Sequence, residues 1–162
     1  MPRFWLDANV LIEAHNGSYP YDMAITFWAR MAEQIECGHI AGVRRIYQEL
    51  AEHEKHQDAV AQFVQNRRKF LSIMPSHEVT KKVGEIQAYT FGKYVHAQAW
   101  EFSRGGDPWV IAQAWEDGGI VATKESDLKP LAQKARIPDV ADHFGVKCVD
   151  TLTMLKMLGV KF

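Results

Sequence analysis

The spacing of apolar residues changes several times along the chain, and the changes predict strands alternating with helices. Residues 4–6 (Phe-Trp-Leu) form an unbroken apolar run, which is typical of a strand covered on both faces of a parallel sheet. Asp7 follows at once, and Asn9 is then the expected N-cap of a helix through Val10, Leu11 and Ile12. The first strand therefore ends in an acid that should lie at the carboxyl edge of the sheet.

The same pattern continues to the end of the chain. Helical spacing predicts a helix from Asp22 to Glu36, and its expected buried stripe is Met23, Phe27, Trp28, Met31 and Ile35. The other expected elements are strands within 39–42, 120–123 and 146–149, and helices from Val43, from Pro108 to about Asp117, between Pro138 and His143, and from Leu152.

Residues 58–103 are mostly helical in pattern and predict a helical arm or cap over the sheet. Two amphipathic stretches meet near residues 71–75, and the second includes Val83, Ile86, Trp100 and Phe102 among its apolar positions. Basic residues gather at the inner ends of the two stretches, where a solvated face and an RNA-contacting patch are both open: Arg67, Arg68, Lys69, Lys81 and Lys82.

Strands separated by helices predict an α/β fold with a central parallel sheet of four or five strands flanked by helices. The length of 162 residues fits a single domain over 1–162. The net charge of −1 gives no overall basic character, so any nucleic-acid contact must depend on a local patch.

Cysteine usage and hydropathy favour a cytoplasmic protein. Cys37 and Cys148 are isolated, which argues against a disulfide framework or a structural zinc site and fits a reducing compartment. The apolar run at the N-terminus is too short for a signal peptide and is broken by Asp7, and no segment approaches transmembrane length.

Four acids fall where one cleft could collect them: Asp7, Glu49, Asp107 and Glu125. Open α/β sheets bind ligands at the carboxyl ends of their strands. Carboxylates that converge there would raise one another's pKa values. Mg²⁺ or Mn²⁺ would relieve the repulsion, and one or two such ions support phosphodiester hydrolysis.

Each acid also has a simpler interpretation. Asp107 precedes Pro108 and could be only a helix cap, and Glu49 could be a solvated helix residue. Glu125 competes with Asp127, two residues later, for the fourth position, and either could belong to an ordinary turn.

Taken together, the motifs resemble those of the PIN-domain nucleases, in particular a PilT/PIN-like subgroup catalogued as a domain of unknown function. The resemblance runs over nearly the whole chain: Asp7-x-Asn9 after an apolar strand, Glu49-Leu50 on a helix, Asp107-x-x-Val110, and Thr123-x-Glu125 after a strand. It implies a Rossmann-like PIN fold, Mg²⁺- or Mn²⁺-dependent cleavage of single-stranded RNA, and the toxin role of a VapC-type toxin–antitoxin pair.

By position, the resemblance makes Asp7, Glu49 and Asp107 the central acids, with Asn9 as a polar support beside the first. Glu125 stands where most members carry Asp, which puts tight binding of a second ion in doubt; Thr123 and Asp127 are supporting candidates. Candidate RNA contacts near the cleft are Arg44, Arg45, Arg104 and Lys124. An antitoxin and a second copy of the chain are the expected protein partners.

Three rival interpretations compete with this one. A phosphoaspartyl phosphatase or receiver domain also places Asp after its first strand, but Asn9 stands where the phosphatases need a second Asp. A zinc hydrolase is disfavoured because His53 and His56 are one residue short of the H-E-x-x-H spacing. A PIN-like module that binds RNA or protein with little turnover is the serious alternative.

Overall fold

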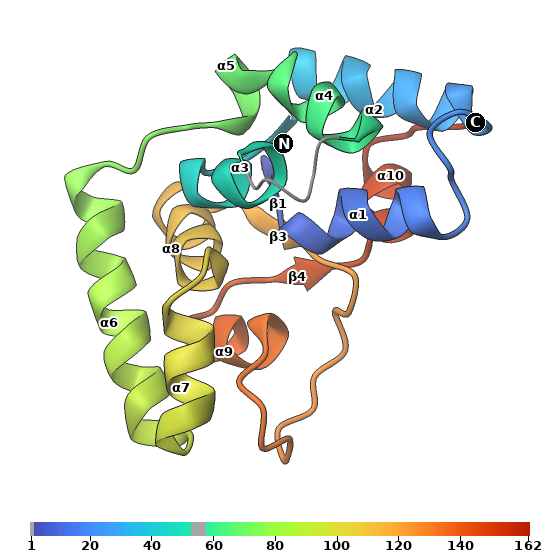
Figure 1. Ribbon diagram of the computed structural model, residues 1–162. Coiled ribbons are helices and arrows are strands. Elements are labelled where there is room, and N and C mark those ends of the chain that lie inside the picture. Colours follow the sequence, from blue (N-terminus) through green and yellow to red (C-terminus); the bar gives the residue numbers. More distant parts are fainter. Residues whose placement is uncertain (1, 53–57) are drawn as a thin grey trace.

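Four short strands form one parallel sheet in the computed structural model, which describes residues 2–52 and 58–162 (Figure 1). The sheet order is β2-β1-β3-β4, and Phe4 pairs with both Ile40 and Ile120. The predicted α/β class and parallel pairing are confirmed. The strands are β1 (Phe4–Leu6), β2 (Ile40–Ala41), β3 (Ile120–Ala122) and β4 (Cys148–Val149).

Ten helices are present in the described part of the chain and flank the sheet. They are α1 (Ala8–Asn16), α2 (Ile25–Glu36), α3 (Arg44–Ala51), α4 (Ala59–Gln65), α5 (Arg68–Leu71), α6 (His77–Lys93), α7 (His96–Ser103), α8 (Asp107–Asp117), α9 (Ile137–His143) and α10 (Thr151–Met157). α8 packs on β1 and β3, α2 on β2, and α9 on β4. The predicted alternation of strands and helices is thus confirmed.

The core begins at β1, where all three side chains are at most 2% exposed. A strand this apolar on both faces needs helices over both faces of the sheet. Within the sheet, β1 lies between β2 and β3. The indole of Trp5 donates a hydrogen bond of 2.9 Å to Asp117 at the end of α8. Gly118, with φ of 70°, then ends α8 in the left-handed conformation that glycine favours, and the chain turns into β3.

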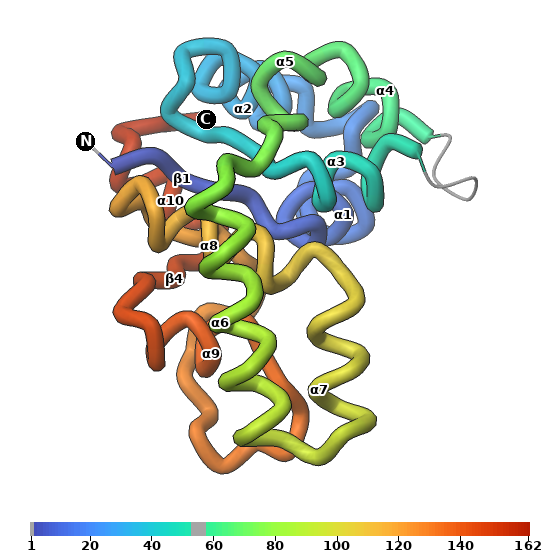
Figure 2. The backbone as a smooth tube through the Cα atoms, turned by 90° about the vertical axis from the view of Figure 1, so that its left-hand side faces the viewer, coloured from blue at the N-terminus to red at the C-terminus, as the bar shows by residue number. Residues whose placement is uncertain are grey.

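The predicted helical arm is correct in content but divides into two parts. α4 and α5 pack against α1, α2 and α3. α6 and α7 form an antiparallel hairpin that packs on α8 and extends away from the sheet (Figures 1 and 2). The segment at residues 72–76 joins the two parts, and a parallel bridge between Val43 and Ile73 fixes it beside the start of α3.

Two residues expected in the core lie at the surface. Met23 is 79% exposed because α2 begins only at Ile25, so Met23 belongs to the preceding turn. Trp100 is 58% exposed, whereas Phe102 on the same helix is buried. α7 is short and packs through Ala99 and Phe102, so the face that carries Trp100 points to solvent.

Within the described ranges, no helix combines the length and apolar character needed to cross a bilayer.

The orientation of α7 can be tested with a matched pair of substitutions. We expect Phe102→Ala to lower the free energy of unfolding by about 3–5 kcal/mol, because it leaves a cavity in the core. Trp100→Ala should lower it by clearly less, because more than half of that side chain is already exposed to water. Urea denaturation followed by circular dichroism measures both, and equal losses would contradict the packing of α7.

Candidate active site

Asp7 lies at the carboxyl edge of the sheet, between the ends of β1 and β3. Its backbone N–H donates to the carbonyl of Ala122 over 2.9 Å, and its Oδ2 accepts the hydroxyl hydrogen of Thr123 over 3.0 Å. The chain adds β2 on one side of β1 and β3 on the other, so this point is the switch in strand order where open α/β sheets form their crevice. Asp7 is only 3% exposed.

Asn9 does not cap α1, contrary to the prediction. Asp7 itself occupies the N-cap position in extended conformation, and its side chain makes no capping hydrogen bond. The helix starts earlier than predicted because the strand ends directly in the cap residue. Asn9 lies in the first turn, exposed, and lines the cleft beside Asp7.

Asp107 is the first residue of α8, and the simpler interpretation of it as the helix cap is wrong. Gly106 occupies the cap position, and no side chain caps this end of the helix. The helix therefore begins one residue before the predicted start. The carboxyl group of Asp107 instead lines the same cleft as Asp7.

Glu49 reaches the start of α8 from α3. Its Oε1 accepts a hydrogen bond of 2.7 Å from the backbone N–H of Gly106, the residue directly before Asp107. A Cβ at residue 106 would collide with Ile46 Cδ1 and lie 3.1 Å from Glu49 Oε1. Glycine at this position is therefore what lets α3 approach α8 and Glu49 anchor there.

The cleft between these elements has a volume of about 260 Å³. The predicted residues that line it are Asp7, Asn9, Asp107, Thr123, Lys124 and Glu125, and Lys134 and Arg136 join them. Glu49 is outside this lining and approaches Asp107 from the side of α3. The structure thus gathers three of the four predicted acids around one cleft, with the fourth adjacent.

The pKa values follow from this crowding. Burial and the negative charge of Glu49 raise the pKa of Asp7 to about 6, against the hydrogen bond from Thr123. Burial, then the charges of Asp7 and Glu49, raise the pKa of Asp107 to about 7, and Lys134 opposes the rise. Burial also raises the pKa of Glu49, while the Gly106 N–H and Arg45 oppose it. The three acids therefore act on one another electrostatically.

Cys148, in β4, is a thiol to be considered as a nucleophile. Burial, followed by the charges of Asp7, Asp142 and Asp139, raises its pKa to about 12. Since the thiolate is the nucleophilic form, Cys148 stays inert at neutral pH.

Glu125 lies on the outer part of the cleft, where Arg136 holds it. The guanidinium of Arg136 donates to Glu125 over 3.4 Å, to the carbonyl of Asp127 over 3.1 Å and to Asp139 over 3.0 Å. Arg136 therefore fastens the loop after β3 to the start of α9. Of the two competitors, Glu125 lines the cleft with its side chain, whereas Asp127 contributes a backbone carbonyl to this network.

Each basic residue proposed near the cleft has a partner within the protein. Arg44 donates to Met74 Sδ, Arg45 to the carbonyl of Arg104, and Lys124 pairs with Glu13 over 3.3 Å. Arg104 pairs with Glu101. Lys124 alone among the four lines the acidic cleft.

Sequence reasoning missed Lys134 and Arg136. Both lie around the irregular segment 123–136, which has no periodicity that would place a side chain. In the basic cluster on 67–82, Arg67 pairs with Glu36 and Lys82 pairs with Glu116 over 2.6 Å. These two side chains therefore join helices to one another, which favours the structural interpretation for them.

The donor set suits a hard divalent cation without forming a closed cage. Among residues 2–52 and 58–162, no three His, Cys, Asp or Glu side chains are close enough to hold one ion by themselves. Mg²⁺ commonly binds through one or two carboxylates and completes its shell with water and substrate phosphate. Asp7 and Asp107 fit that mode, since both are carboxylates whose charge is unfavourable without a cation. His53 and His56, the zinc candidates, lie outside the described residues.

Comparison with known proteins places the chain in a family. Residues 4–162 match the family model described as a domain of unknown function (DUF4411), and the chain belongs to that family. No curated protein and no solved structure matches the chain.

The raised pKa values predict how stability depends on pH without metal. A group whose pKa is higher in the folded state stabilises the fold below its unfolded pKa near 4, and that stability is lost as pH rises through 6 to 7. In EDTA, Asp107→Asn should therefore be more stable than wild type at pH 8 by on the order of 2 kcal/mol, and by less at pH 5. Urea unfolding at both pH values measures this difference.

Asp22→Asn, a change of the same kind in an exposed turn outside the cleft, is the control. A constant difference for Asp107→Asn between pH 5 and pH 8 would mean that folding does not raise the pKa of Asp107.

Gly106→Ala tests the approach of α3 to α8. The new methyl group collides with Ile46, so we expect a loss of about 1–3 kcal/mol in stability and disruption of the Glu49–Gly106 hydrogen bond. Gly84→Ala on α6 meets no atom within 4 Å and should stabilise by about 0.5–1 kcal/mol. Thermal unfolding with amide exchange at residue 106 provides the measurement. Unchanged protection in Gly106→Ala would be the contrary result.

Proposed function

We propose that this member of the DUF4411 family is a Mg²⁺- or Mn²⁺-dependent endoribonuclease that cuts single-stranded RNA. The observation that carries the proposal is the meeting of Asp7 and Asp107 in one cleft, with Glu49 close enough to raise both pKa values. These acids come from β1, α3 and α8, and burial makes their negative charge costly. The resemblance to PIN-domain nucleases supports the same assignment at the same positions.

Asp7 and Asp107 would hold the cation, with Glu49 approaching from α3. When bound, such an ion neutralises the carboxylates, binds phosphate oxygens and lowers the pKa of a coordinated water. The hydrogen bond from Thr123 orients Asp7, and the Gly106 N–H orients Glu49 through Oε1.

The basic side chains around the acids position the RNA backbone. Lys134 lines the cleft, and its charge already acts on Asp107. Lys124 lines the cleft too and is half exposed, so its ammonium group can leave Glu13 for a phosphate. Arg136 is 10% exposed and engaged by Asp139 and Glu125, so it maintains the loop and does not contact RNA.

We assign Glu125 a supporting role through this loop. Its carboxylate bonds to Arg136, which competes with direct binding of a second ion. A single ion held by Asp7 and Asp107 is therefore the simpler arrangement. The ion pair between Glu125 and Arg136 also favours a second candidate function, a PIN-like module that binds RNA or protein with little turnover.

The resemblance also supports a proposal for the biological role of the chain. VapC-type toxins act with a small antitoxin, and we propose the toxin role and such a partner for this chain. Exposed apolar side chains such as Met23, Ile25 and Leu131 offer contact area for a protein. A neighbouring gene for a small DNA-binding protein would support this assignment.

The experiment that tests the nuclease is cleavage of labelled tRNA and mRNA pools by purified protein with Mn²⁺ or EDTA. We expect cleavage only with the metal. Asp7→Asn should lower the rate by at least about 100-fold, since loss of even an outer-shell partner commonly costs 10–100-fold. Asp22→Asn should cleave like wild type.

Thermal melting and the cleavage assay together separate the two candidate functions. Mn²⁺ should stabilise the wild type by mass action, by about 2.7 kcal/mol at 100 times its dissociation constant, and should not stabilise Asp7→Asn in the same way. Metal-dependent stabilisation without RNA cleavage would favour the binding module. Wild-type cleavage by Asp7→Asn would remove Asp7 from the site.

A further inference from the structure

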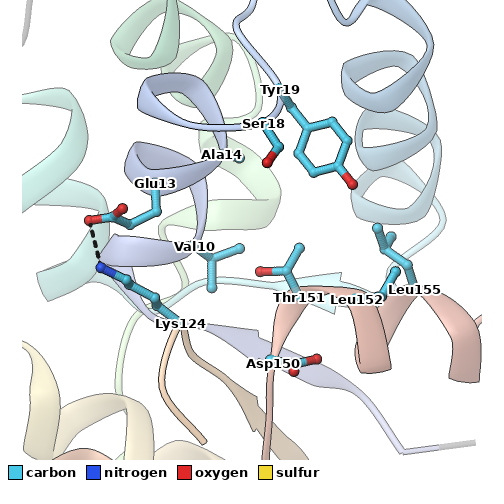
Figure 3. Close-up of a pocket in the computed structure, with 10 residues that line it drawn as sticks. All are labelled: Val10, Glu13, Ala14, Ser18, Tyr19, Lys124, Asp150, Thr151, Leu152 and Leu155. Atoms are coloured by element: carbon cyan, nitrogen blue, oxygen red, sulfur yellow. Dashed lines mark ion pairs between the residues drawn. The ribbon is translucent and has the colours of Figure 1, made fainter.

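A second cavity of about 260 Å³ lies between α1 and α10, and none of the proposed chemistry uses it (Figure 3). Its walls are largely apolar, from Val10 and Ala14 on α1 and from Leu152 and Leu155 on α10. The ring of Tyr19 closes one end. That ring stacks on Phe27 at 4.2 Å between centroids, so this end of the cavity is rigid.

The opposite end of this cavity is shared with the acidic cleft. Glu13 and Lys124 line both, and their ion pair of 3.3 Å stands between them (Figure 3). Both side chains are about half exposed, so the pair is weak and can open without a large cost. A ligand lying over Lys124 would therefore reach both the acids and the apolar cavity.

The cavity also carries a few polar groups among its apolar walls. Ser18 and Thr151 present hydroxyl groups, and Asp150 presents a carboxylate. One oxygen of Asp150 accepts the N–H of Thr153, and this bond lowers its pKa, so the carboxylate stays charged at neutral pH. A flat apolar ligand with hydrogen-bond donors along one edge matches this combination.

We propose that this cavity binds one base of the RNA, that of a nucleotide next to the phosphate in the acidic cleft. The inference rests on the proposed function for the neighbouring cleft. The base lies between the α1 and α10 walls, and its donor-bearing edge faces Asp150 and Thr151, while Ser18 lies beside Tyr19 at the other end of the cavity (Figure 3). Lys124 turns from Glu13 to the connecting phosphate. Bases with an exocyclic amino group are preferred, because a charged carboxylate accepts hydrogen bonds and donates none.

The test uses the metal-free protein, so that no cleavage occurs, and the four nucleoside 5′-monophosphates as probes. Methyl chemical shifts of Val10, Ala14, Leu152 and Leu155 report on the cavity. We expect saturable shifts, largest for the nucleotides that carry amino groups. Leu152→Glu places a second negative charge on the wall, at a residue that is 52% exposed and so tolerates it, and should weaken binding at least tenfold.

Met157→Glu is the matched control, since it makes the same kind of change on the same helix outside the cavity, and it should bind like wild type. The proposal is supported if nucleotides shift the resonances of these methyl groups, and if Leu152→Glu weakens nucleotide binding whereas Met157→Glu does not. This holds whether or not the protein cuts RNA. Absent shifts, or equal binding by Leu152→Glu and wild type, overturn it even if Mn²⁺-dependent cleavage is found. Failure of cleavage with intact binding here would refute only the nuclease.

Discussion

Burial of the carboxylates of Asp7 and Asp107 in one cleft is the constraint on which the site depends, because burial is the main cause that raises both pKa values and the charge of Asp7 adds to the rise at Asp107. Asp7 is nearly inaccessible to water and has the hydroxyl of Thr123 as its hydrogen-bond donor, while Lys134 is the cationic group that acts on Asp107. The apolar core of β1, β3 and α8 holds both acids in place despite this cost. Unfavourable charge concentrated at one point of an otherwise consistent fold is characteristic of a functional site.

The third acid depends on helix packing and not on a local motif. Glu49 joins the others only because Gly106 lets α3 come against the start of α8, and because residues 70–73 hold the beginning of α3 through backbone hydrogen bonds with Gly42 and Arg44. Segments more than fifty residues apart therefore set the position of one carboxylate. The hydrogen bond between Glu49 and Gly106 then fixes the position of Glu49 relative to Asp107, the next residue.

Periodicity predicted the strands and the strand-end acid, because an unbroken apolar run suits a strand buried on both faces and Asp7 can reach water only where that strand ends. It failed where two local structures share the same residues. Asp-Pro fits a capping residue as well as a first helical residue, so only the structure shows that Asp107 leaves the cap to Gly106. Exposure of Trp100 and the placement of Lys134 depend on tertiary contacts and on an irregular loop, for which the sequence carries no periodic signal.

Charge and apolar surface are separated around the site in a way that matches one kind of ligand. Acids lie innermost, Lys124 and Lys134 stand around them, and an apolar cavity begins on the far side of the Glu13–Lys124 pair. A small anion would need only the cations, and a hydrophobic molecule only the cavity. A polyanion with flat bases along its length uses both together, since each phosphate brings a base with it. For this reason we propose a nucleic-acid strand, and not a free phosphoester, as the ligand of this edge of the sheet.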